Sequence, residues 1–283
     1  MSPTIKIETK SLVQVVIILA AFTILFSNTI AKLVHDWSTN DNYSHGFLVP
    51  FIAAYMIWQK KDQLSQVQTG HCRVGFLTVF LGMCIFVVGN VGAELFIMRT
   101  AIVITIVGIC LSYLGYRNTA VIAVPLLYLL FMIPLPAIIW NKIAFPLQLL
   151  AASLTENVVQ MLGIPLLREG NVLHLPNTTL EVVDACSGLR SLTSLFALSA
   201  AASYMARLNL FSKWILFLSA VPIAIIVNIV RLTSTAYLAL AIGPEAANGF
   251  LHDISGFLSF AGAMVLLFGL YTLLRFLENK FKQ

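Results

Sequence analysis

Three residues of this chain carry groups that could do covalent chemistry, and each lies at the edge of an apolar segment or inside one. Cys186 stands in residues 183–190 (VDACSGLR), where a polar stretch meets a membrane-length apolar segment. Arg231 lies within a second apolar segment, and His252 lies at the start of the next. A thiol nucleophile, a guanidinium that stabilises negative charge and an imidazole that transfers protons together predict a cysteine enzyme built into a bilayer.

The immediate neighbours of Cys186 suit a reactive thiolate. If a helix begins near Ser187, its unpaired N–H groups and its dipole favour the ionised thiol, and Arg190 adds positive charge on the same face. Burial in lipid favours the neutral thiol instead. Gly188 permits close approach of a ligand, so the amides of Ser187 and Gly188 are expected to line an oxyanion site. The alternative is a small packed cysteine followed by residues that begin a helix.

Arg231 lies in the outward half of a long apolar segment, where inserting an arginine costs at least about 3 kcal/mol. A residue at such a depth typically faces a polar cavity and marks a functional site. Asn228, one helical turn earlier on the same face, is expected to orient the guanidinium. The alternative interpretation is a structural ion pair with Asp184 or Asp253 that locks two helices together.

His252 is predicted at the outer mouth of the last apolar segment, at the same membrane face as Cys186. A histidine beside a thiol is the usual proton-transfer partner, and Asp253 would either orient its imidazole or cap the helix. The alternative is an interfacial histidine that only caps a helix end.

A second polar run, residues 41–46 (DNYSHG), is also predicted to lie outside the membrane. It supplies His45 as a second candidate base and Tyr43 as a supporting residue. The alternative is that Ser44 caps a helix and leaves the histidine solvated.

Composition places the chain in a bilayer. Of its 283 residues, 59% are hydrophobic and 10% are charged, against roughly 25% charged in a soluble domain. The net charge of +5 is explained by positive residues in cytoplasmic loops, and no basic patch interleaves with aromatics, so we expect no nucleic-acid partner. The cysteines and histidines lack metal-ligand spacing, so we expect neither a metal nor another cofactor.

We predict an all-α polytopic fold with one amphipathic helix and a small β-hairpin. Residues 141–163 are amphipathic and are expected to form an interfacial or re-entrant helix on the outer face. Residues 171–175 and 179–183 alternate apolar and polar side chains, which predicts an extracytoplasmic hairpin leading into Cys186. The eight predicted transmembrane helices lie near residues 12–34, 44–58, 74–92, 98–114, 119–139, 187–206, 213–241 and 253–275.

Charge fixes the expected orientation. A cytoplasmic N-terminus and alternate threading put most lysines and arginines on the cytoplasmic side. The tails 1–11 and 276–283 are then cytoplasmic, and the active site lies near the outer face. We expect one integral-membrane domain over residues 1–283, with no cleavable signal peptide, because the first apolar stretch is too long for the apolar core of one.

The chain resembles the exosortase/archaeosortase family of polytopic transpeptidases over about residues 36–275. The resemblance implies a catalytic Cys186, Arg231 and His252; in the archaeal branch a second arginine replaces the histidine. The motifs, in family order, are residues 43–46 (YSHG), 134–136 (PLP), 146–148 (PLQ), 168–171 (REGN), 185–192 (ACSGLRSL), 222–231 (PIAIIVNIVR) and His252 with Gly256.

The resemblance also implies the substrates: secreted proteins that end in a Pro-Glu-Pro motif, a transmembrane helix and a basic cytoplasmic tail. Cys186 would form a thioester with them at the outer face of the plasma (inner) membrane. The acceptor would be an amine, such as that of a lipid or glycan, or water. Arg190 is a candidate partner for the substrate glutamate.

Two other functions stay open. One is an intramembrane cysteine protease without transfer. The other is a transporter of polysaccharide intermediates with Arg231 on an anionic headgroup, although the sequence shows no internal repeat of spans.

Overall fold

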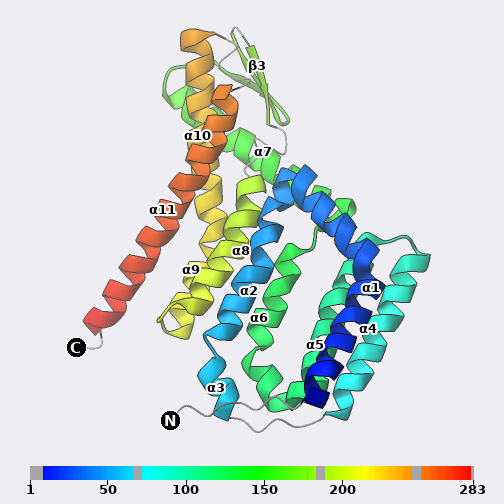
Figure 1. The fold of residues 1–283 in the computed structure, drawn as a ribbon. Helices are drawn as coiled ribbons and strands as arrows, with labels where there is room; N and C mark the ends of the chain where they lie inside the picture. The colour runs from blue at the N-terminus through cyan, green and yellow to red at the C-terminus, as the bar shows by residue number, and fades with distance from the viewer. Residues whose placement is uncertain (1–8, 67–71, 177, 183–188, 244–249, 282–283) are drawn as a thin grey trace. The chain divides into compact units, whose positions relative to one another are not determined.

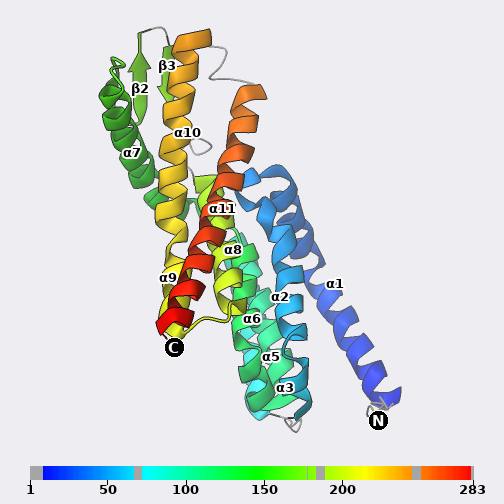
Figure 2. The same cartoon turned by 90° about the vertical axis from the view of Figure 1, so that its left-hand side faces the viewer.

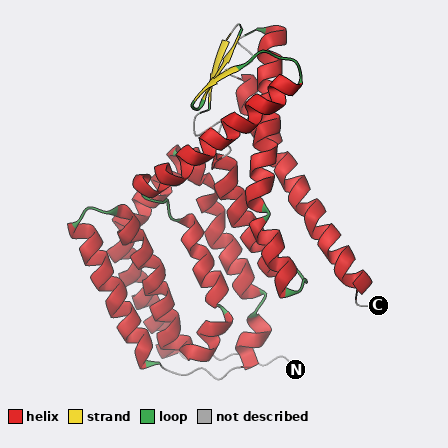
Figure 3. Cartoon of the chain, turned by 180° about the vertical axis from the view of Figure 1, so that it is seen from behind, coloured by secondary structure: helices red, strands yellow, loops and turns green. Residues whose placement is uncertain are grey.

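The computed structural model describes residues 9–66, 72–176, 178–182, 189–243 and 250–281. Helices dominate it, with one small three-stranded sheet (Figure 3). The contacts divide the chain into two compact parts, Met1–Thr39 with Gln59–Ile133, and Asn40–Trp58 with Pro134–Gln283. The expectation of one membrane domain stays a prediction.

The first part is helical throughout its described residues. Its elements are α1 (Thr9–Thr39), α3 (Lys61–Gln66), α4 (Arg73–Val91), α5 (Leu95–Val121), α6 (Ala123–Tyr128) and the short 3-10 helix η2 (Leu129–Met132).

Helices α4 and α5 form a tight antiparallel pair, seen side by side in Figure 1. Three glycines of α4, Gly75, Gly82 and Gly89, face α5 at a spacing of seven residues. A methyl group on Gly82 would lie 2.5 Å from Thr105 Oγ1 and 3.2 Å from Thr105 N. Small residues at such a seam let two backbones approach closely, which stabilises helix pairs in lipid.

The substitution Gly82→Ala is therefore expected to destabilise the protein. Because the new methyl group would overlap Thr105 Oγ1 and press on the Thr105 backbone nitrogen, the two helices must shift apart, at a cost of about 1–3 kcal/mol. The midpoint of thermal unfolding in detergent measures this. Gly269→Ala is the matched control, because nothing lies within 4 Å of that position. Equal midpoints for the two variants would show that the glycine seam is not needed.

A buried ion pair joins α1 to α5 in the same part. Arg99 Nη2 lies 2.6 Å from Asp36 Oδ2, and the arginine side chain is only 3% exposed. One residue later, Trp37 Nε1 donates a hydrogen bond of 2.9 Å to the carbonyl of Met132. These contacts fix the end of α1, and the carboxylate compensates a guanidinium that would be costly to bury alone.

The second part contains the sheet and the remaining helices. Its elements are η1 (Asp41–Phe47, a 3-10 helix), α2 (Leu48–Trp58), α7 (Ala137–Met161), β1 (Leu167–Glu169), β2 (Val172–Leu175), β3 (Thr178–Glu181), α8 (Leu189–Met205), α9 (Leu210–Leu218), α10 (Ala220–Ile242) and α11 (Phe250–Phe281).

The predicted hairpin is confirmed, and a third strand extends it. The sheet order is β1-β2-β3, and both pairs are antiparallel. Leu173, Leu175 and Leu180 point from the sheet into one core with α7 and α10, which flank it in Figure 2. Strand β1 was not predicted, because three residues are too few to show an alternating pattern. Gly170, with φ of +65°, makes the turn into β2.

The polytopic all-α prediction is confirmed. Two predicted spans, 119–139 and 187–206, correspond to the shorter apolar helices Ala123–Met132 and Leu192–Met205. Residues 44–58 divide between the end of η1 and the 11-residue α2. In the described residues, six helical segments are long and apolar enough to cross a membrane: Val13–Thr39, Arg73–Val91, Leu95–Val121, Ala137–Met161, Leu210–Ile242 and Ser255–Lys280. Because α7 is among them, its interfacial or re-entrant placement stays a prediction.

Candidate functional site

The predicted site residues fall into two groups. Cys186, Ser187 and Gly188 lie outside the described residues. Arg190 belongs to the first turn of α8, and His252 and Asp253 to the first turn of α11, but their side chains lie outside the described part as well. The structure describes the side chains of the remaining four: Arg231, Asn228, Tyr43 and His45.

Arg231 lies where α10 changes its neighbours. Before it, Ile223 and Ala224 pack in a core with residues of α8 and α11. After it, Leu232 and Ala236 pack against the sheet and α7. Arg231 therefore lies on α10 between the core that this helix shares with α8 and α11 and the core that it shares with the sheet and α7.

The length of the segment agrees with this position. Residues Leu210–Ile242 number 33, which is about 50 Å of helix, whereas the hydrocarbon core of a bilayer is about 30 Å thick and needs about 20 residues. A helix that enters near Leu210 leaves the hydrocarbon close to Arg231. If the hydrocarbon begins near Leu210, Arg231 lies near its far boundary, where the cost of burying a charge is lower than at the bilayer centre.

The guanidinium of Arg231 lies against α11. The residue is 9% exposed, and a methyl group on Gly256 would lie 3.7 Å from its Nη1 atom. Residues four apart are separated by about one helical turn, so position 252 lies one turn before Gly256 along α11. The spacing of His252 and Gly256 could have shown this in the sequence, once the contact between α10 and α11 was known.

The side chain of Asn228 makes no hydrogen bond to Arg231. It is 3% exposed, and neither its Nδ2 nor its Oδ1 atom has a hydrogen-bond partner within the described part of the chain. The two residues are three apart on one face of α10, but the arginine extends to Gly256 of α11 instead. The amide is therefore buried without a hydrogen bond to Arg231, and a role of Asn228 in orienting the guanidinium stays a prediction.

His45 is half-buried and lies against α8. Its Nδ1 atom is 3.3 Å from Ser194 Oγ, and the neighbouring Thr193 Oγ1 donates a 2.9 Å hydrogen bond to the carbonyl of Asn42. Thr193 and Ser194 follow Arg190 by one helical turn. The segment that contains His45 is thus attached to the end of α8 nearest to Cys186 in the sequence.

The alternative of a Ser44 cap with a solvated histidine is wrong. Asn40 caps η1 by accepting a hydrogen bond from Asn42 N, and Ser44 Oγ instead donates to the carbonyl of Asp41. The buried Tyr43 ring packs on Trp140 of α7, with 5.7 Å between ring centroids.

Sequence reasoning missed Thr193, Ser194 and Trp140. Ser194 follows Arg190 by four residues, so helical spacing could have placed it on the same face. Nothing local in the sequence indicates that Trp140 meets Tyr43, because the contact joins segments about a hundred positions apart.

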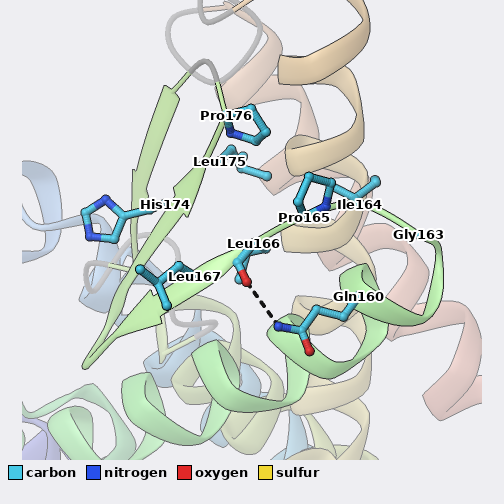
Figure 4. Close-up of a pocket in the computed structure, with 9 residues that line it drawn as sticks. All are labelled: Gln160, Gly163, Ile164, Pro165, Leu166, Leu167, His174, Leu175 and Pro176. Carbon is cyan, nitrogen blue, oxygen red and sulfur yellow. Dashed lines mark hydrogen bonds between the residues drawn. The ribbon is translucent and has the colours of Figure 1, made fainter.

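A pocket among the described residues lies elsewhere in the second part of the chain. It measures about 690 Å³ between the end of α7 and the sheet, and Gln160 Nε2 donates a 3.0 Å hydrogen bond across its floor to the carbonyl of Leu166 (Figure 4). Its described lining includes neither Arg231 nor His45. The pocket is therefore not the candidate reaction site.

The helices and their apolar lengths define a multi-pass integral membrane protein. A family model described as transmembrane exosortase matches residues 37–269, most of the chain. The chain belongs to the transmembrane exosortase family, which supports a membrane transpeptidase-like role on secreted substrates with sorting signals. Comparisons with curated proteins and with solved structures give no match.

Proposed function

We propose that this protein is a cysteine transpeptidase. It cleaves the C-terminal Pro-Glu-Pro sorting signal of secreted proteins near the outer face of the plasma (inner) membrane, with both of its own termini in the cytoplasm. The substrate's transmembrane helix docks in the bilayer beside the enzyme. The secreted part is transferred to an amine-bearing acceptor, such as a lipid or glycan amine.

Two displacements on one carbonyl make up the reaction. The Cys186 thiolate attacks the scissile carbonyl carbon, the C–N bond breaks, and His252 gives a proton to the departing amine. The acceptor amine then attacks the thioester and loses a proton to His252, and the thiolate leaves. Arg231 stabilises the negative oxygen formed in each displacement.

Other residues support these steps. The amides of Ser187 and Gly188 assist Arg231 at the oxyanion, and Arg190 pairs with the substrate glutamate. Asp253 orients the imidazole of His252. Tyr43 and His45 form a wall of the site on the side of α8.

One observation carries the proposal: the Arg231 guanidinium is buried against Gly256, one turn from position 252 of α11. A buried arginine is costly unless its charge is compensated or serves a polar site, and here its guanidinium lies one turn of α11 from the position of the proposed base. Helix α8, which follows Cys186, packs against both α10 and α11.

An added amine tests for transfer. Detergent-solubilised protein is incubated with a tagged Pro-Glu-Pro substrate and a biotin-linked primary amine. A transpeptidase attaches biotin to the new C-terminus of the secreted part, and the Cys186→Ala variant does not. Cleavage without biotin at any amine concentration would instead identify an intramembrane protease, and transport of a polysaccharide intermediate that survives Cys186→Ser would identify a carrier.

A further inference from the structure

We propose that the side-chain amide of Asn228 binds a peptide group of the substrate backbone beside the scissile bond. This inference rests on the proposed function, because it assigns a ligand to the same site. It replaces the expected role of Asn228 as a partner of Arg231.

The side-chain amide of Asn228 is buried without hydrogen bonds to other described residues. Asn228 is 3% exposed, and both polar atoms of its side chain lack a partner within the described residues. A buried amide without hydrogen bonds destabilises a fold, whereas an apolar side chain of similar size would pack there at no such cost. An asparagine in this position is expected where a ligand completes its hydrogen bonds.

Asn228 also lies close to the helices of the proposed site. Asn228 precedes Arg231 by one turn on the same side of α10, and its neighbours Ala224 and Val227 pack in the core that α10 shares with α8 and α11. The amide therefore lies within the three helices that carry or follow the proposed reactive groups. It also lies close to the membrane boundary, where a substrate passes from its secreted part into its transmembrane helix.

The carboxamide of Asn228 is chemically complementary to a peptide group. A carboxamide donates through Nδ2 and accepts through Oδ1, so it matches the carbonyl oxygen and the N–H of one peptide group. Arginine only donates, which suits an oxyanion. A neutral amide in a site of low polarity favours a neutral peptide group over a charged ligand, because it cannot compensate a buried charge.

The test separates stability from substrate binding. Asn228→Leu removes both polar atoms and keeps the number and branching of the side-chain heavy atoms, so the thermal midpoint in detergent should stay unchanged or rise. In a Cys186→Ala background, which keeps the substrate uncleaved, the same change should weaken capture of a tagged Pro-Glu-Pro substrate by roughly 10- to 100-fold. Processing by Asn228→Leu with Cys186 intact should fall by a similar factor.

Thr155→Val is the matched control. Thr155 is also fully buried in the second part of the chain, and its Oγ1 atom likewise lacks a partner among the described residues. The isosteric valine should keep or raise the thermal midpoint and leave capture and processing unchanged.

Two results would overturn the inference. In one, Asn228→Leu captures and processes substrate like the wild type. In the other, its thermal midpoint falls, which would give Asn228 a structural role. Asn228→Asp, which keeps the size of the side chain, is the second variant, and full capture of substrate by it would also overturn the inference. Normal processing by Cys186→Ala would instead refute the proposed function, so the two failures are distinguishable.

Discussion

Replacing Cys186 with alanine is expected to reduce processing of a Pro-Glu-Pro substrate by roughly four orders of magnitude or more, since loss of an enzyme's nucleophile removes the covalent route altogether. Co-expression with a tagged substrate, read as the ratio of cleaved to uncleaved protein, measures this. The thermal midpoint should stay close to that of the wild type.

Cys84→Ala is the control for this experiment. Cys84 is an exposed cysteine of α4, within an apolar helix that contributes nothing to the proposed chemistry. Its loss should leave processing unchanged. Processing that survives in Cys186→Ala, or that disappears in both variants, would remove the nucleophile from the proposal.

Replacing Arg231 with glutamine is expected to lower the rate of processing by about 10²–10³-fold, the usual effect of losing one donor at an oxyanion. Glutamine keeps a donor group but loses the charge, and its shorter side chain cannot fill the place of the guanidinium beside Gly256. Single-turnover cleavage at saturating substrate measures the chemical step separately from binding.

Arg99→Gln is the matched variant, because Arg99 is the other deeply buried arginine that the structure describes. Its carboxylate partner, Asp36, makes it part of a structural ion pair. We therefore expect Arg99→Gln to lower the thermal midpoint and to leave the rate per folded molecule unchanged. The reverse pattern, with Arg231→Gln unstable and fully active once folded, would make Arg231 the structural residue.

Much of the fold follows from local signals in the sequence. Apolar runs of membrane length predict the long helices, and the alternation around Pro176 predicts the pairing of β2 with β3. The sequence does not predict elements that are too short to show a periodic pattern. Strand β1 has three residues, and η1 replaces the first turns of the predicted span at residues 44–58.

The types of the candidate site residues could be recognised in the sequence, but the contacts that these residues make could not. A charged residue within an apolar segment marks Arg231 as unusual from the sequence alone. Its neighbour Gly256 and the meeting of His45 with Ser194 depend on how distant helices pack, which no local pattern encodes. The unpartnered amide of Asn228 is likewise a property of the packed structure, because the i, i+3 spacing by itself suggests a contact with Arg231 that does not form.

The thioester itself is the most direct test of the central claim. Purified protein is mixed with a tagged substrate and quenched in acid, and the mass of the intact chain and of its peptides is measured. The account predicts a substrate adduct on the peptide that contains Cys186, released by neutral hydroxylamine and absent from Cys186→Ala. An adduct on another residue, or complete cleavage with no adduct at any time under these conditions, would contradict it.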